Sequence, residues 1–220
     1  MHNAATRAIP AGEFVSRIRR FAAQTPRLAV IFLVLLLAVP TALVAIAEGA
    51  ALTPLPFNLF VVDQRLPGIF KLHMLASGAG MLLIPLVIVL RRHRAWHRPL
   101  GRVAATAVVL GALTSLPVAA ASHSVAMARA GFFAQGIVWL TLIALGVTAI
   151  RRKQIATHQR LMLAMAAVAS GALWVRLGTT IATSCDLPFD PIYGCVAWAG
   201  WMVPLAIVWV FPPLLTAGRA

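Results

Sequence analysis

The sequence predicts an all-α integral membrane protein with six transmembrane helices. Of its 220 residues 61% are hydrophobic and only 11% are charged, whereas a typical soluble domain has about 25% charged residues. The apolar residues also come in unbroken blocks of about 20 residues, the length of a spanning helix. No alternating pattern of the kind that forms a transmembrane β-barrel is present in the chain.

Six segments qualify as spans, because at about 1.5 Å per residue each of them crosses a hydrocarbon core of about 30 Å. They are residues 28–47, 69–90, 101–121, 131–150, 160–182 and 196–215. The first segment has a basic lead and ends in Ala45-Ile46-Ala47, which resembles a cleavable signal peptide. Its apolar run is long for such a signal, so we expect an uncleaved anchor.

The positive charges predict the orientation of these spans. Fifteen of the 19 lysines and arginines lie in the N-terminal segment, in the 91–102 loop, in the 151–160 loop or at Arg219. This distribution alternates correctly through six crossings and places both termini in the cytoplasm. The predicted parts are a basic segment (1–27), one transmembrane domain (28–215, with core 69–182) and a tail (216–220). The arginines lie at the ends of the apolar segments and not together on one soluble face. Their positions therefore argue against a nucleic-acid-binding surface.

Cys185 and Cys195 both fall in the last outer loop, CDLPFDPIYGC. Two neighbouring cysteines that close a short loop in an oxidising compartment predict a disulfide. The alternative is that they are two unrelated small residues.

An internal repeat with an offset of 60 residues relates the two basic loops and the helices that follow them. Arg91-Arg92 matches Arg151-Arg152, and the triplet 111–113 matches 171–173. His97 and His158 fall one position out of register. The repeat predicts that spans two to five form a four-helix core of two parallel hairpins, related by a pseudo-twofold axis along the membrane normal. Spans three and five would then lie diagonally, with spans one and six flanking the core.

Small residues mark the faces on which these helices are expected to meet. Ser77, Gly78, Ala79 and Gly80 follow one another in the second span, and Gly111, Ser115, Ser170 and Gly171 lie mid-membrane. Small side chains allow the close approach that holds helices together in lipid. The alternative interpretation is room for a flat ligand.

The histidines at helix ends are the candidate metal ligands. His97 and His158 are predicted at the cytoplasmic side, and His73 and His123 at the outer side. Two imidazoles on facing helices can hold one haem iron, and forked donors of Arg98, Arg102 and Arg160 could pair with the haem propionates. Pro99 argues against a haem, because proline is best placed in the first turn of a helix. This puts His97 at or before the N-terminal cap, at the membrane interface. The simpler interpretation is that these are interfacial histidines bonded to a loop or a lipid.

Arg176 lies inside the fifth span, about six residues from its outer end. An arginine in a span is costly unless it is paired, snorkelling or hydrated, so it is a functional candidate. We therefore expect an outer polar pocket of Arg176, His73, Lys71 and Gln135 for an anionic group or a quinone-like carbonyl. The alternative is a structural ion pair of Arg176 with Asp63 or Asp186.

Several motifs together resemble a family of bacterial predicted membrane proteins, domain-of-unknown-function family 2306. They are His73 with the small-residue run to Gly80, HRPLGR at 97–102, HQRLML at 158–163, and Arg176. The resemblance implies a multi-helix bacterial membrane protein and no particular activity. With the orientation that the positive charges predict, we expect it in the inner membrane, with the Cys185–Cys195 loop in the periplasm. The chain is more loosely similar to the six-helix, di-haem ascorbate-reducible cytochrome b superfamily, but its fourth span lacks a histidine.

Three functions are compatible with these features. The first is a b-type-cytochrome-like electron carrier that exchanges electrons with quinone, with His97 and His158 as haem ligands. The second is a non-catalytic accessory or assembly subunit that packs against other membrane subunits and binds anionic lipid through its basic loops. The third is a small-anion transporter with Arg176 as the anion contact. Hydrolase, nucleotide-binding and zinc-finger signatures are absent from the sequence.

Overall fold

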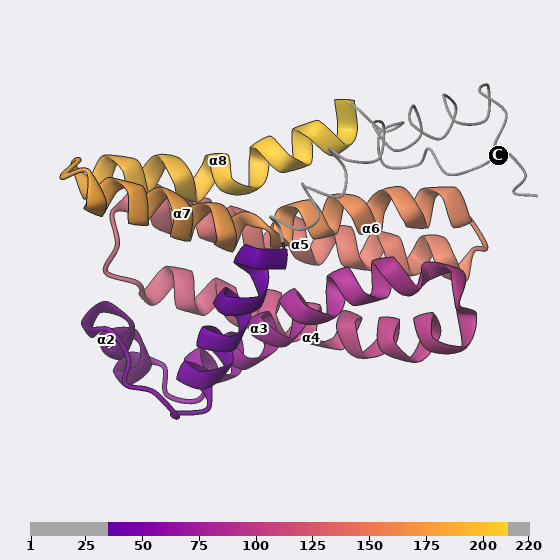
Figure 1. The fold of residues 1–220 in the computed structure, drawn as a ribbon, viewed down its shortest axis with the longest axis horizontal. Helices are drawn as coiled ribbons and strands as arrows, with labels where there is room; N and C mark the ends of the chain where they lie inside the picture. Colours follow the sequence, from indigo (N-terminus) through magenta and orange to yellow (C-terminus); the bar gives the residue numbers. More distant parts are fainter. Residues whose placement is uncertain (1–34, 211–220) are drawn as a thin grey trace, which may run out of the picture. The chain divides into compact units, whose positions relative to one another are not determined.

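The computed structural model describes residues 35–210, which are almost entirely helical and contain no strand (Figure 1). The helices are α2 (Phe57–Arg65), α3 (Ile69–Val89), the short 3-10 helix η1 (Leu90–Arg92), α4 (Arg94–Ala121), α5 (Ala126–Arg151), α6 (Ile155–Ala169), α7 (Gly171–Ser184) and α8 (Phe189–Val210). A further apolar helix, Leu35–Gly49, precedes them. The predicted segments 1–27 and 216–220, the start of the first span and the end of the sixth lie outside the described residues.

Five helices of the described chain are long and apolar enough to cross a membrane. They are Ile69–Arg92, Arg94–Ala121, Ala126–Arg151, Ile155–Ser184 and Phe189–Val210. Each corresponds to one predicted span from the second to the sixth, and helix Leu35–Gly49 covers the end of the first. The all-α, multi-span fold class is therefore confirmed.

Two predicted helix starts are wrong. Helix α8 begins at Phe189 rather than 196, because Pro191 in its first turn needs no N–H partner and Asp190 favours the positive end of the helix dipole. Helix α4 begins at Arg94, so Pro99 lies inside the helix and His97 in its first turn, not before the cap. The carbonyl that Pro99 leaves without a helical partner belongs to Ala95, which is exposed.

The predicted fifth span is interrupted at Ser170, which separates α6 from α7. A break inside a membrane leaves carbonyls without their helical partners unless other groups replace them. The Ser170 hydroxyl donates to the Ala167 carbonyl at 2.7 Å, and the Gln135 amide donates to the Val168 carbonyl at 2.9 Å. Two side chains therefore satisfy the backbone beside the break.

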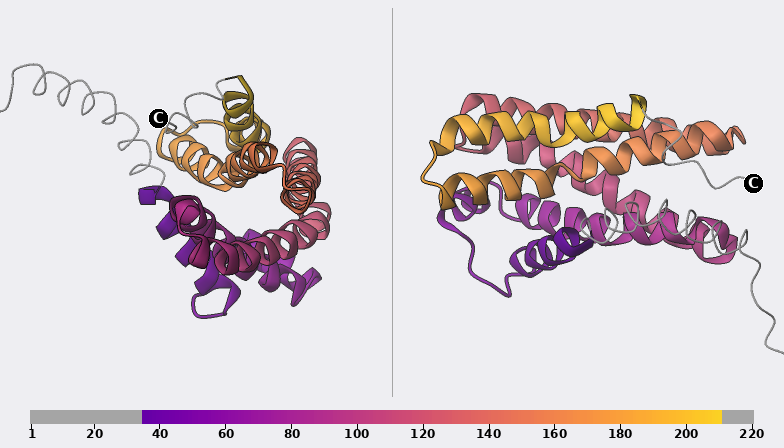
Figure 2. Two further views of the ribbon diagram at one scale, coloured as in Figure 1. Left: turned by 90° about the vertical axis from the view of Figure 1, so that its right-hand side faces the viewer. Right: turned by 45° about the horizontal axis from the view of Figure 1, so that its top comes forward.

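The long helices from α3 onward pack side by side within the compact unit that starts at Ala38 (Figures 1 and 2). Helix α3 packs on α4, α4 on α5, and α5 on α6, while α8 covers α5, α6 and α7. Helices α4 and α6 share no extended contact, and α3 contacts α6 only slightly, so the closed four-helix core with a pseudo-twofold axis stays a prediction. Their central core includes the fully buried Val108 and Val168, which are equivalent positions of the repeat.

The small residues lie where helix backbones approach most closely. A Cβ atom at Gly111 would lie 2.8 Å from the Ser77 hydroxyl, and one at Gly136 would lie 2.5 Å from the Ser115 hydroxyl. A Cβ at Gly171 would lie 2.5 Å from the Gln135 amide nitrogen. These contacts assign the predicted small-residue faces to helix packing.

Candidate functional site

The two histidines of the basic loops each bond a backbone carbonyl of the preceding helix. His97 Nδ1 lies 3.1 Å from the Val87 oxygen on α3, and His158 Nδ1 lies 2.9 Å from the Gly146 oxygen on α5. A carbonyl only accepts, so Nδ1 carries a proton, and in the neutral ring Nε2 keeps its lone pair. We call these two bonds the hairpin clasps, because each joins the two helices of one hairpin.

A second pair of bonds joins the same hairpins nearer the membrane centre. His73 Nδ1 donates to the Gly111 carbonyl at 2.9 Å, and Gln135 donates to the Val168 carbonyl at 2.9 Å. The acceptors lie in or just before the matched triplets 111–113 and 171–173. Each hairpin therefore has one clasp near its turn and one polar bond near its middle.

The candidate haem ligands do not meet in one place. His97 on α4 and His158 on α6 each turn toward their own hairpin partner, and those two helices share no extended contact. His123 is exposed in the loop between α4 and α5. Residues 35–210 contain no group of three or more His, Cys, Asp or Glu side chains placed to hold a metal ion. A haem shared by His97 and His158 therefore fits this arrangement poorly.

The arginines proposed for the propionates lie on exposed helix surface. Arg98 and Arg102 are exposed on the first turns of α4, and Arg160 is exposed on α6. The guanidinium of Arg160 stacks over the ring of Trp209 at 4.0 Å, a cation–π contact that holds α6 against the end of α8.

The four residues of the predicted outer pocket have separate partners. Lys71 lies 3.6 Å from the Asp63 carboxylate, while His73 and Gln135 bond the carbonyls described above. Arg176 is exposed on α7 and forms no ion pair within the described residues, so neither Asp63 nor Asp186 neutralises it there. Helices α3 and α7 share no extended contact, and no direct contact gathers these side chains into one site.

Two carboxylates are buried, of which the sequence indicated Asp63 only as a partner for Arg176 and did not indicate Glu48. Glu48 and Asp63 are each only 7% exposed. Asp63 lies on α2, which folds back on α3 through the turn at Gly68, where φ is +81°. The signal for Asp63 was its eight-residue spacing from Lys71 across Pro67-Gly68, a turn that brings the two charges together.

The predicted disulfide is not formed in the structure. Cys185 and Cys195 are both free and exposed. Because α8 begins at Phe189, Cys195 is held in the second turn of a helix rather than in a loop that could close on Cys185.

One end of the helices gathers basic side chains. We call it the basic end: it contains the α3–α4 and α5–α6 connections, which lie together in Figure 1. Nine exposed basic residues lie there, namely Arg91, Arg92, Arg94, Arg98, Arg102, Arg151, Arg152, Lys153 and Arg160. The described carboxylates, Glu48, Asp63, Asp186 and Asp190, all lie toward the opposite end.

The fold and these bonds define a class: a polytopic α-helical membrane protein with two similar hairpins in its core. The chain belongs to the family described as predicted membrane protein (DUF2306), which matches residues 70–211 and so confirms the family resemblance. No curated protein and no solved structure matches the chain. The looser similarity to the cytochrome b superfamily stays a prediction.

Proposed function

We propose that the protein is a non-catalytic, lipid-binding subunit of the bacterial inner membrane, with its basic end in the cytoplasm. The observation that carries this proposal is the set of nine exposed basic residues at one end, where residues 35–210 place no carboxylate. Each lysine or arginine near an anionic leaflet contributes about 1 kcal/mol of attraction. Together they favour phosphatidylglycerol and cardiolipin head groups over zwitterionic ones.

The polar groups of the core support a structural role for the helices. His73, His97, Gln135 and His158 all bond carbonyls of neighbouring helices. Such bonds stabilise helix pairs in lipid. These four side chains are thus engaged in joining helices rather than free to face a substrate, which favours the accessory role over the transport role of Arg176.

Native mass spectrometry of the detergent-purified protein tests this proposal. Phosphatidylglycerol and phosphatidylcholine of identical chain length are added in turn, and the adducts that survive activation are counted. The proposal predicts more retained phosphatidylglycerol, and a smaller excess at higher salt because screening weakens surface charge. Arg176→Gln, which removes a charge at the opposite end, should keep the excess. Equal retention of the two lipids by the unaltered protein would contradict the proposal.

A second candidate function, electron transfer to or from quinone, is favoured by the protonation of the clasps. With Nδ1–H on a backbone carbonyl, the Nε2 atoms of His97 and His158 keep free lone pairs, and this is the orientation usual for histidine ligands of metals. Because the two histidines do not meet, a haem would be held by the Nε2 atom of one of them alone. It would supply one-electron redox chemistry, and Arg98 or Arg102 beside His97 would neutralise its propionates. A reduced-minus-oxidised spectrum of protein purified after growth with haem precursor tests it: sharp b-type bands support this function, and a flat spectrum contradicts it.

A further inference from the structure

Two open grooves flank the part of α4 that lies just inside the basic end. The larger, of about 550 Å³, lies between α4 and α5, and the smaller, of about 400 Å³, lies between α3 and α4. Both are open grooves on the helix surface rather than enclosed cavities. Thr106 and Leu110 line both grooves and form the ridge between them, which we call the α4 ridge.

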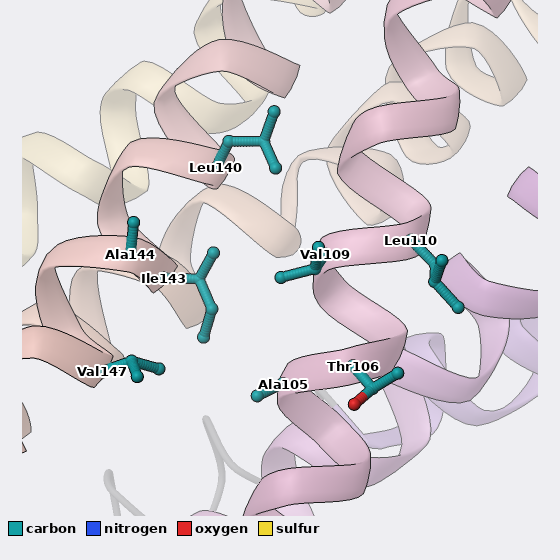
Figure 3. Close-up of a pocket in the computed structure, with 8 residues that line it drawn as sticks. All are labelled: Ala105, Thr106, Val109, Leu110, Leu140, Ile143, Ala144 and Val147. Atoms are coloured by element: carbon teal, nitrogen blue, oxygen red, sulfur yellow. The ribbon is translucent and has the colours of Figure 1, made fainter.

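The groove surfaces are apolar and open toward the bilayer. Figure 3 shows Val109 and Ala105 of α4 facing Ile143 and Val147 of α5 across the larger groove. Ile143 at its floor is 3% exposed, whereas Leu110 on the ridge is 38% exposed.

The hydroxyl of Thr106 does not make this surface polar. It donates to the Arg102 carbonyl of its own helix at 3.1 Å, and so is turned back onto α4. The α4 ridge therefore presents apolar surface to both grooves.

Positive charge lies directly beyond the basic end of both grooves. Arg102 precedes Thr106 by four residues and so continues the α4 ridge on the same helix face. Arg98 lies one turn further, and Arg151 follows Val147 of the larger groove by four residues on α5. All three arginines are exposed, and no ion pair is formed by them within the described residues.

The depth of the grooves matches one leaflet. From Arg102 to Leu110 is eight residues, or about 12 Å along a helix. Half of a hydrocarbon core of about 30 Å is about 15 Å. On α4 the groove walls thus reach from the head-group level at Arg102 toward the middle of the membrane, and Leu72 of α3 extends the smaller groove further from the basic end.

We propose that this surface binds one two-chain anionic phospholipid that straddles α4. One acyl chain lies in each groove, and the phosphate is held by Arg102, with Arg151 on the larger-groove side. The apolar ridge separates the chains, and forked guanidinium donors suit a phosphate. This assignment rests on the proposed lipid-binding function and gives it one defined site.

Single-charge variants in the same mass spectrometry assay test the head-group contact. Arg102→Gln should lower the retention of dioleoyl phosphatidylglycerol about fivefold, the effect of one basic residue at an anionic surface. Arg92→Gln is the matched control, because it removes the same charge at the same end but away from the grooves. Equal losses in the two variants would overturn the site.

The chains are tested separately. Lyso-phosphatidylglycerol, which has one chain, should be retained less than the two-chain lipid, and Ala144→Phe, which fills the larger groove, should reduce that difference. Ala172→Phe, an exposed position on α7, should leave it unchanged. Equal retention of one- and two-chain lipid by the unaltered protein would overturn the straddling arrangement.

The lipid-binding function and the defined site on α4 can be contradicted separately. If phosphatidylglycerol exceeds phosphatidylcholine but Arg102→Gln behaves like Arg92→Gln, the defined site is wrong and general anionic binding stands. If phosphatidylglycerol and phosphatidylcholine are retained equally by the unaltered protein, the lipid-binding function and the site are both wrong.

Discussion

Each polar side chain that joins the hairpins donates to a backbone carbonyl. His73, His97, Gln135 and His158 supply the donors, and in lipid no water competes for the carbonyl as it does at a surface. The sequence marked the three histidines as candidates but could not show their partners. A helix-end histidine suits a haem iron, a lipid phosphate or a neighbouring carbonyl equally well, and only the packing of α3 on α4 and of α5 on α6 decides among them.

Substitutions at His158 can distinguish its role in the hairpin clasp from a role as a metal ligand. His158→Asn keeps a donor at the position of Nδ1 and removes Nε2, whereas His158→Ala removes both. If the bond to Gly146 is the role of this residue, alanine should lower the free energy of unfolding by about 0.5–1.5 kcal/mol, and asparagine should largely restore it. Denaturation in mixed detergent micelles measures this difference.

Arg176 serves as the comparison for that experiment, since it is exposed and makes no ion pair in the described chain. Arg176→Ala should leave the unfolding transition close to that of the unaltered protein. Should asparagine at position 158 destabilise as much as alanine, the clasp would not be the main role of His158.

At the scale of the elements, composition and length predicted the helices well, and local backbone features changed their limits. Apolar runs of about 20 residues located the spans within a few positions. The starts of α4 and α8 were missed because a proline in the first turns of a helix is compatible with several start positions. The break at Ser170 was missed because it depends on Gln135 of another helix, which satisfies the freed carbonyl of Val168.

Two glycines on α3 provide a matched test of close helix packing. A Cβ at Gly78 would lie 2.9 Å from the Ala42 carbonyl oxygen, while one at Gly80 would lie 3.7 Å from Val108 and meet ordinary contact. Gly78→Ala should therefore destabilise the protein by about 1–3 kcal/mol through overpacking. Gly80→Ala should be neutral or slightly stabilising, since alanine favours a helix by about 1 kcal/mol over glycine.

Both variants are measured by the same detergent unfolding titration. A loss of stability of equal size in the two variants would show that the α3 face does not discriminate between these positions, and would contradict the assignment of Gly78 to a close helix contact.

At the scale of the whole molecule, the charge distribution predicts the orientation. Cys185 and Cys195 are exposed at the end opposite the basic end, and they are the two cysteines of the chain. In intact cells whose outer membrane is permeabilised, an impermeant maleimide should label them before any reagent enters the cytoplasm. A cysteine placed at Arg152 in a Cys185→Ser/Cys195→Ser background should react only after the inner membrane is opened. The reverse pattern would contradict a cytoplasmic basic end.

The sequence constrains the function of the protein less than it constrains the fold. The positive charges that orient a membrane protein are the same charges that bind anionic lipid, so their number alone does not separate topology from binding. What the structure adds is position: Arg102 and Arg151 continue the apolar groove walls of α4 and α5, and the Arg102→Gln and Arg92→Gln variants separate this position from charge number alone.

The lipid that surrounds the protein in its own membrane tests the central claim most directly. The protein is extracted in polymer-bounded discs without detergent, and the phospholipids of the purified discs are compared with those of the whole membrane. Because the basic end binds anionic head groups, we expect phosphatidylglycerol and cardiolipin to be enriched over phosphatidylethanolamine in the discs. Discs with the same head-group composition as the membrane from which they were cut would contradict it.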